Sequence, residues 1–474
     1  MKTTGIDKPS PKNPRTGRSA GILLHPTSLP GPYGIGELGP EALAFVDFLA
    51  RGGQRLWQTL PLSPTGGDGS PYSSYSAFAG NPLLVSTERL LEDGLVKAAE
   101  KVSGDTVDYP AVISAKTKLL REAFGNAKPG EEFEAFVVEH REWLEDYALY
   151  LALKGKYGGR AWNLWDEGLA KREPGALKDA REELSAEIRF HQFVQYLFFE
   201  HWSDVKDAAN EAGIEVVGDI PIFVSHDSVD VWARQDLFHL DASGNPTVVA
   251  GVPPDYFSET GQLWGNPLYD WKAMREDRYS WWVGRMRMAL TLYDVVRVDH
   301  FRGFEAYWEI PAAAETAQEG RWVKGPGEEV FEAFEAGLGE LPIIAEDLGE
   351  ITPEVEALRD RLGLPGMKVL QFAFSGPDNA FLPHEYEGSN WVVYTGTHDN
   401  DTTAGWWRSA DPAGRRFARR YIGKDYVSVQ DFIRLAYASV AERAIIQIQD
   451  FLELGPEHRM NTPGTPEGNW AWRL

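Results

Sequence analysis

Three acidic side chains stand at or just after the ends of short apolar runs, and their types and positions suit acid–base and covalent chemistry. They are Asp299, Glu346 and Asp399. A retaining glycosidase uses one ionised carboxylate as nucleophile and one carboxylic acid as proton donor, with the two groups about 5–5.5 Å apart. We predict that Asp299 is the nucleophile, Glu346 the acid/base, and Asp399 a third carboxylate that holds sugar hydroxyls.

The hexapeptide VVRVDH, residues 295–300, places an arginine two positions before the first of these acids. Strand side chains alternate between faces, so Arg297 and Asp299 share one face and two valines share the other. If the valines pack on outer helices, both charged groups point inward, where the guanidinium favours the ionised carboxylate. An internal Arg–Asp ion pair without a catalytic role explains the hexapeptide alone equally well.

Glu346 ends an apolar run in the segment PIIAEDLG. Desolvation against an apolar wall raises the pKa of a carboxyl group, which suits a proton donor to a leaving glycosidic oxygen. A second interpretation is a Glu-Asp pair that caps the positive end of the following helix. Asp347 fits this second interpretation better than Glu346 does.

The third acid lies in the segment TGTHDNDT, residues 395–402, directly after His398. A carboxylate here can hold sugar hydroxyls and help to distort the ring. The alternative is a polar turn in which Asn400 or Asp401 is the N-cap of a helix. Each motif alone is moderate evidence, but three acids on strand ends of one barrel would converge on a single mouth.

Eight short apolar runs predict the elements that position these acids. Short continuous apolar runs indicate strands buried on both faces, as in a parallel sheet, and helical patterns separate several of them. We therefore predict an α/β fold, a (β/α)8 TIM barrel with its active site at the carboxyl ends of the strands. The runs are residues 22–24, 56–62, 216–217, 295–298, 343–345, 369–374, 392–394 and 445–448.

The remaining segments predict the domain organisation. Residues 1–19 are polar and form a flexible N-terminal arm, and residues 20–474 form the catalytic barrel. Apolar residues at helical spacing predict a large, mostly helical insertion over 83–212, after strand 2. A loop-rich insertion after strand 3 covers 226–280, and its segment 251–258 is a candidate lid. Little follows the eighth run, so no C-terminal β-domain is expected.

Composition narrows the classes of partner. The 474 residues carry a formal net charge of −24, which repels nucleic acid and anionic membranes and favours a neutral substrate. There are no cysteines, which excludes disulfides, thiolate metal sites and a cysteine nucleophile. No signal-peptide pattern and no apolar run of membrane-spanning length is present. We expect a cytoplasmic protein.

Other residue types suited to a sugar site surround the acids. Asp219 ends another apolar run, Tyr72 lies in the loop SPYSSY after the second strand, and Trp264 lies in GQLWGNP. Aromatic rings offer flat apolar faces to a pyranose. The chain has 17 Trp and 18 Tyr, so any single aromatic is more often a core residue than a sugar contact.

At these motifs the chain resembles a known family, the 4-α-glucanotransferases of the amylomaltase (disproportionating enzyme) type, glycoside hydrolase family 77 of the α-amylase clan. The resemblance runs from GILLHPTSLP at residue 21 to NTPGT at 461 and NW at 469, and omits only the first twenty residues. The other shared motifs are the segments 70–82, 251–258, 264–269 and 297–303.

The resemblance implies a retaining double displacement on α-1,4-glucans. Asp299 would attack the anomeric carbon, and Asp399 would bind the 2- and 3-hydroxyls of the sugar. Glu346 would protonate the leaving oxygen and then deprotonate the acceptor hydroxyl. It implies no cofactor and no metal. Its expected ligands are maltooligosaccharides, amylose or other α-1,4-glucans, bound by a monomer or weak homodimer. The substrate-binding residues it implies are Tyr72, Ser70, Asp219, Arg297, His300, His398, Trp264, Asp255, Tyr256 and Asn461.

Three alternatives stay open at this point. An α-amylase-like hydrolase would use the same acids, and transfer is favoured only where water is kept from the glycosyl-enzyme. A metal-dependent barrel hydrolase would use the pairs 299–300 and 398–399 with Glu346, although adjacent side chains usually point apart. A non-catalytic glucan-binding protein would not need a nucleophile.

Overall fold

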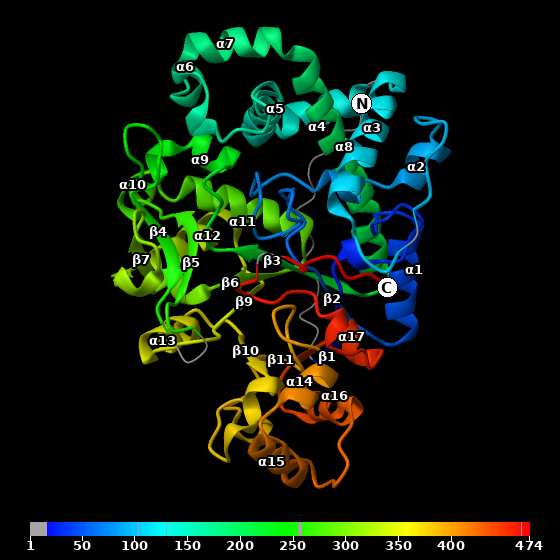
Figure 1. The fold of residues 1–474 in the computed structure, drawn as a ribbon, viewed down its shortest axis with the longest axis vertical. Coiled ribbons are helices and arrows are strands. Elements are labelled where there is room, and N and C mark those ends of the chain that lie inside the picture. Colours follow the sequence, from blue (N-terminus) through cyan, green and yellow to red (C-terminus); the bar gives the residue numbers. More distant parts are fainter. Residues whose placement is uncertain (1–16, 103, 129, 255–257, 466) are drawn as a thin grey trace.

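Eight parallel strands form the centre of the molecule (Figure 1). The computed structural model describes residues 17–102, 104–128, 130–254, 258–465 and 467–474. The strand order is β10-β11-β12-β1-β2-β3-β6-β9, and every ladder between neighbours is parallel. The strands are β1 (Ser19–Leu23), β2 (Leu56–Gln58), β3 (Glu215–Pro221), β6 (Val295–Asp299), β9 (Ile343–Ala345), β10 (Gly366–Val369), β11 (Trp391–Tyr394) and β12 (Arg443–Gln447).

The barrel is nearly closed. Between β9 and β10 no ladder forms in the described chain, and the Ala345 N–H donates to the Pro365 carbonyl at 2.9 Å across this seam. The predicted (β/α)8 barrel is therefore confirmed as a near-closed form. The strands are buried on both faces, as continuous apolar runs require, with Val296 and Val298 fully buried.

One predicted strand was shifted. The run 369–374 was expected as a strand, but β10 ends at Val369 and residues 370–375 form a 3₁₀ helix. Phe374, at the end of this helix, packs against Trp406 and Phe432 instead of joining the barrel. Periodicity could not separate these two uses of one apolar run.

Helices cover the outside of the barrel between most strands. No α-helix links β10 to β11 in the described chain, where 3₁₀ turns make the connection. The covering helices are α1 (Pro40–Arg51), α8 (Ser185–Glu211), α11 (Ser280–Leu292), α12 (Glu329–Leu338), α13 (Pro353–Arg361) and α16 (Val429–Ala438), and the short α17 (Ile448–Phe451) directly follows β12.

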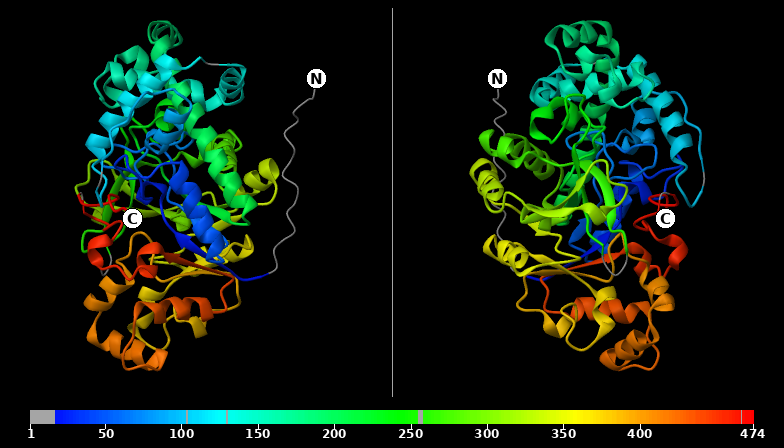
Figure 2. Two further views of the ribbon diagram at one scale, coloured as in Figure 1. Left: turned by 90° about the vertical axis from the view of Figure 1, so that its right-hand side faces the viewer. Right: turned by 60° about the vertical axis from the view of Figure 1, so that its left-hand side comes forward.

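A helical layer lies above the barrel, at the top of Figure 1 and of both views of Figure 2. Its aromatic core joins α4 to α8, where Phe133 packs edge-on against Phe193 and Tyr196. The long α8 contributes to this layer and also packs on α1 and β3, so it links the layer to the barrel. The helices are α2 (Thr87–Glu92), α3 (Tyr109–Asn126), α4 (Glu131–Glu139), α5 (Arg141–Lys156), α6 (Glu167–Ala170) and α7 (Pro174–Glu183).

A second sheet lies beside the barrel mouth. It is antiparallel, with order β5-β4-β7-β8, and its strands come from the segments after β3 and after β6. The segment 226–280, which we expected to be loop-rich, therefore contains a β-hairpin together with α9 (Val229–Ala233) and α10 (Trp271–Glu276). The four strands are β4 (Val248–Val252), β5 (Gln262–Pro267), β7 (Ala306–Pro311) and β8 (Arg321–Lys324).

The connections from β10 to β11 and from β11 to β12 form a smaller unit at the bottom of Figure 1. It contains α14 (Thr403–Ser409), α15 (Pro412–Ile422) and α16, around a separate apolar cluster that includes Phe374, Leu382 and Phe432. The sequence analysis did not anticipate this unit.

The predicted N-terminal arm lies mostly outside the described residues. Its last two residues belong to the barrel: Ser19 begins β1, and the Arg18 guanidinium donates to the carbonyls of Tyr437 (2.7 Å) and Ala441 (3.1 Å). Among the described helices, none is both long and apolar enough to span a bilayer.

Candidate active site

An arginine inside the barrel joins two carboxylates from neighbouring strands. The ladder between β3 and β6 sets Asp219 opposite Arg297, and Pro221 opposite Asp299. Arg297 Nη1 donates to both oxygens of Asp219 at 2.8 and 2.7 Å, and Nη2 lies 2.9 Å from Asp299 Oδ1. The guanidinium is almost fully buried, so Arg297 and Asp299 share the inward face, as the alternation predicts.

A left-handed residue brings the second acid to the first. His300, directly after Asp299, has φ of +53°, which is uncommon outside glycine and is found where local strain serves a site. In this conformation its N–H donates to Glu346 Oε2 at 2.7 Å, and the Leu348 N–H donates to Oε1 at 3.0 Å. The ends of the adjacent strands β6 and β9 thus hold Asp299 and Glu346 side by side.

The two acids share one electrostatic environment. Burial and the negative charge of Asp299 raise the pKa of Glu346 to about 8. Burial also raises the pKa of Asp299, to about 7, because it outweighs the opposing effect of Arg297. The sequence led us to expect that the guanidinium favours the ionised form of Asp299; the raised pKa differs from this expectation because burial has the larger effect. Near neutrality the pair holds one proton, and Arg297 favours its placement on Glu346.

The third acid is more open. The Asp399 side chain is 43% exposed, accepts a hydrogen bond from Asn461 Nδ2 at 2.6 Å and lies 3.3 Å from His398 Nε2. Its charge also contributes to the raised pKa of Asp299, so the third carboxylate lies near Asp299. The residues that the sequence analysis drew from three strand ends therefore meet at one mouth.

Neither helix-capping alternative describes the structure. Asp347 accepts a hydrogen bond from the Met367 N–H at 2.7 Å and forms a buried ion pair with Arg359 of α13, so it joins two elements without capping one. The N-cap of α14 is Thr402, whose hydroxyl accepts from the Gly405 N–H at 3.1 Å. Neither of the two predicted residues, Asn400 and Asp401, has this role.

An aromatic wall stands beside the acids. The Tyr72 hydroxyl donates to Asp219 Oδ2 at 2.7 Å, and its ring stacks on His398 with centroids 5.2 Å apart. Trp470 packs on both rings, at 5.7 and 5.9 Å. Burial lowers the pKa of His398, so its imidazole is neutral at pH 7. Ser70 lies on the same loop, and its Oγ accepts from the Tyr72 N–H at 3.3 Å.

The hairpin β4–β5 reaches the opposite side of the site. Trp264 of β5 is 38% exposed and packs edge-on against His300, with centroids 4.9 Å apart. Burial lowers the pKa of His300 to about 3, and its buried Nε2 has no hydrogen-bond partner in the described chain. Two further predicted residues, Asp255 and Tyr256, lie outside the described residues.

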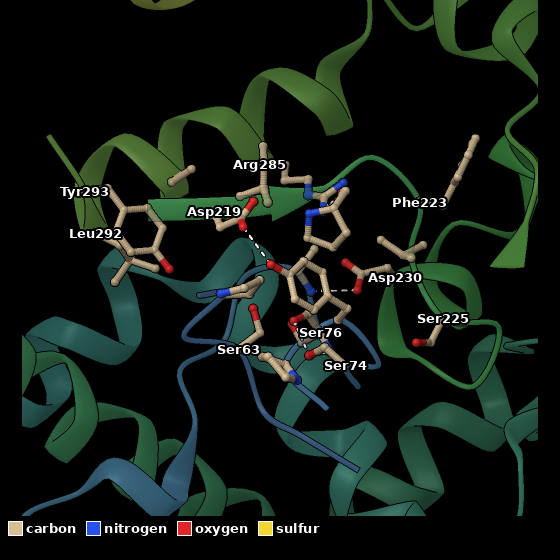
Figure 3. A pocket seen from close by; sticks show the side chains of 18 residues that line it. Ser63, Ser74, Ser76, Asp219, Phe223, Ser225, Asp230, Arg285, Leu292 and Tyr293 are labelled. Carbon is tan, nitrogen blue, oxygen red and sulfur yellow. Dashed lines mark hydrogen bonds between the residues drawn. The ribbon is translucent and has the colours of Figure 1, made fainter. Parts of the chain in front are cut away.

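A pocket behind Asp219 contains polar residues that the sequence analysis missed (Figure 3). Arg285 of α11 donates to the carbonyls of Pro221 and Ile222 and braces the end of β3. Burial raises the pKa of Asp230, on α9, to about 6. Neither residue follows a strand, so the pattern that found the acids could not find them.

Among the described residues, no three His, Asp or Glu side chains gather in a way that could hold a metal ion.

Comparisons with known proteins agree on one family. The family model described as 4-alpha-glucanotransferase, glycoside hydrolase family 77, matches residues 24–474. The chain is 54% identical to a 4-alpha-glucanotransferase of Thermus thermophilus over 96% of its length and 95% of the relative, and 49% identical to one of a Synechocystis strain over 96% and 94%.

Solved structures give the same result. An amylomaltase from Streptococcus agalactiae, in complex with acarbose, superposes with a TM-score of 0.93 at 39% identity and covers 96% of this chain and 95% of that one. An amylomaltase from Corynebacterium glutamicum, at 18% identity, shares the fold with a TM-score of 0.78 over 96% of this chain and 71% of that one.

Proposed function

The chain belongs to glycoside hydrolase family 77, the 4-alpha-glucanotransferases, and from this premise we propose how it performs that activity. It transfers α-1,4-glucan segments from a donor maltooligosaccharide to the 4-hydroxyl of an acceptor glucan or glucose. The reaction is a retaining double displacement through a β-glycosyl-enzyme on Asp299. The ion pair from Arg297 to both Asp219 and Asp299 is the observation on which this assignment depends.

In the first step Asp299 attacks the anomeric carbon as the bond to the leaving oxygen breaks. Glu346 donates its proton to that oxygen, so the leaving chain departs as a neutral alcohol. The raised pKa of Glu346 keeps this proton available near neutral pH. Arg297 stabilises the carboxylate of Asp299 before attack, and Asp219 balances the charge of the guanidinium when Asp299 becomes an ester.

In the second step the roles of Glu346 reverse. The acceptor 4-hydroxyl attacks the anomeric carbon, Glu346 takes its proton, and Asp299 leaves as a carboxylate. Asp399 holds the 2- and 3-hydroxyls of the distorted ring through both steps. Its position, beside Asn461 at the exposed end of the site, supports this role.

Transfer instead of hydrolysis requires that water be kept from the glycosyl-enzyme while an acceptor is bound. The hairpin β4–β5 is the candidate for this task. Trp264 packs against His300, one residue from the nucleophile, so the hairpin already covers one side of the site. The acceptor sugar would complete the cover by packing against the exposed ring.

The test is incubation with maltotriose. Glucose together with a ladder of longer maltooligosaccharides is expected from transfer, whereas glucose and maltose alone would indicate a hydrolase. Activity that a chelator abolishes would support the metal-dependent alternative. An Asp299→Ala variant should still bind glucan and lose turnover. A cytoplasmic location and a monomer or weak homodimer state stay predictions.

A further inference from the structure

We propose that Arg459 is a positioning residue for Asp399. It acts from the C-terminal segment, residues 456–472, through two backbone carbonyls that flank the sugar-binding edge of the site. The inference rests on the proposed function, which gives Asp399 the task of holding the distorted ring.

Asp399 needs an external support. Its loop joins β11 to α14, and its side chain is 43% exposed. A carboxylate that binds two hydroxyls of a strained ring must be held in one orientation before the sugar arrives. In the described chain its side-chain partners are Asn461, whose Nδ2 donates at 2.6 Å, and His398, at 3.3 Å.

Arg459 fixes the loop that supplies this donor. Its Nε donates to the Asn461 carbonyl at 2.6 Å and its Nη2 donates to the Asp399 carbonyl. The Asn461 N–H donates to the His398 carbonyl at 3.1 Å. One planar guanidinium therefore joins the backbones of Asn461 and Asp399, and the side chains of the same two residues are hydrogen-bonded to each other. A lysine cannot replace it, because the lysine ammonium lacks two donors in one rigid plane.

The guanidinium is used for carbonyls and not for a carboxylate. Throughout the described residues, no Asp or Glu lies within ion-pair distance of Arg459. This geometry favours a positional role for Arg459 beside Asp399, whose side chain is more exposed than that of Asp299.

The segment that holds Arg459 is itself firmly anchored. The Trp472 indole N–H donates to His458 Nδ1 at 2.9 Å, and the Ser28 hydroxyl donates to the Trp472 carbonyl at 2.7 Å. The ring of Trp470 packs against Tyr72 and His398. Figure 2 shows this red segment beside the blue N-terminal part of the barrel. Arg459 thus links Asp399 to a support that does not depend on the sugar.

The experiment compares Arg459→Met and Arg459→Lys with matched changes at Arg473. Arg473 directly follows this segment and also donates to backbone carbonyls, at Gly31 (2.8 Å) and Leu29 (3.4 Å), but it contacts none of the three acids of the site. With maltotriose as substrate, Arg459→Met should lower kcat roughly 10- to 100-fold with little change in KM, since a misplacement of about 1 Å has this effect. The kcat of Arg459→Lys should lie between that of Arg459→Met and that of the parent protein. The Arg473 variants should lower Tm and keep kcat per folded molecule.

A double-variant test separates position from stability. Acarbose affinity is measured by calorimetry for Arg459→Met alone, for Asp399→Asn alone and for both together. If Arg459 acts through Asp399, Arg459→Met lowers the affinity for acarbose in the parent protein. In the Asp399→Asn background the same change lowers this affinity by less than about twofold more. Equal losses in both backgrounds would overturn the inference, as would parent-like kcat in a folded Arg459→Met or Arg459→Lys variant. Full activity of Asp399→Asn would instead contradict the proposed function itself.

Discussion

Replacing Glu346 with glutamine removes the proton and leaves the shape of the side chain. Glucan turnover should fall roughly 10²- to 10⁴-fold, because the leaving oxygen then departs without general acid catalysis. An α-maltosyl fluoride donor should escape this loss in the first step, since fluoride leaves without a proton. The bond from carbon to fluorine breaks as Asp299 bonds to the anomeric carbon, so one fluoride is released per active site in a burst.

The pH dependence of that burst follows from the paired carboxyl groups. Activity needs Asp299 ionised and Glu346 protonated, so the rate rises through the lower pKa, about 7, and falls through the higher, about 8. The reactive state is therefore most populated between the two pKa values and declines on the acidic and the alkaline side. In Glu346→Gln only Asp299 titrates, so the alkaline decline disappears and the acidic decline remains.

The assay is fluoride release followed with an ion-selective electrode from pH 5.5 to 9, with intact-protein mass to show the glycosyl-enzyme. The activity of the parent protein on maltotriose should decline between pH 7.5 and 9, whereas the fluoride burst of the variant should not decline. An alkaline fall that persists in the variant would refute the assignment of Glu346. The His300 and Leu348 N–H groups both donate to the carboxyl group of Glu346. In the glutamine variant the amide NH₂ would face one of these donors without an acceptor, so the variant should lose about 1–3 kcal/mol of stability.

Three further changes test the supports around the acids. Tyr72→Phe keeps the ring but removes the bond to buried Asp219, so kcat/KM should fall roughly 10- to 100-fold, and unchanged kinetics would contradict this. Asp347→Asn breaks a buried ion pair outside the catalytic mouth and should lower the free energy of unfolding in urea by about 3–5 kcal/mol, with kcat per folded molecule retained. A loss of kcat with normal stability would contradict that role. Gly218→Ala places a methyl group 2.1 Å from the ring of Tyr293 and should lower stability by about 1–3 kcal/mol, and an unshifted Tm would show that the strand yields freely.

The strand ends were predictable because their signal is local. Buried parallel strands are continuous apolar runs, and the residue that ends each run faces the mouth, which located Asp299 and Glu346 without any knowledge of contacts. The same rule cannot locate the end of a strand when the apolar run continues into the next element. The 3₁₀ helix after Val369 is as apolar as the strand before it, because Phe374 is buried in a different cluster.

Long-range pairings escaped the sequence for a related reason. The antiparallel sheet pairs β4, which precedes β6 in the sequence, with β7, which follows it. No alternation of apolar and polar residues in either segment specifies the other as its partner. Arg285 and Arg459 escaped too, since each binds backbone carbonyls and depends on where the chain passes, not on the residue types nearby. Thr402 could have been preferred as N-cap from its type, but Asn400 and Asp401 rank as high.

The pairing of β1 with both β2 and β12 has a consequence for the order of events during synthesis. The earliest strand emerges from the ribosome with one edge unpaired, and that edge stays open until residues 443–447 have been made. Asp399, its loop and the donor from Asn461 come together later still. A nascent chain that ends between Glu346 and Asp399 therefore has two of the three acids and an unpaired edge on β1, and such an edge can pair with strands of other chains.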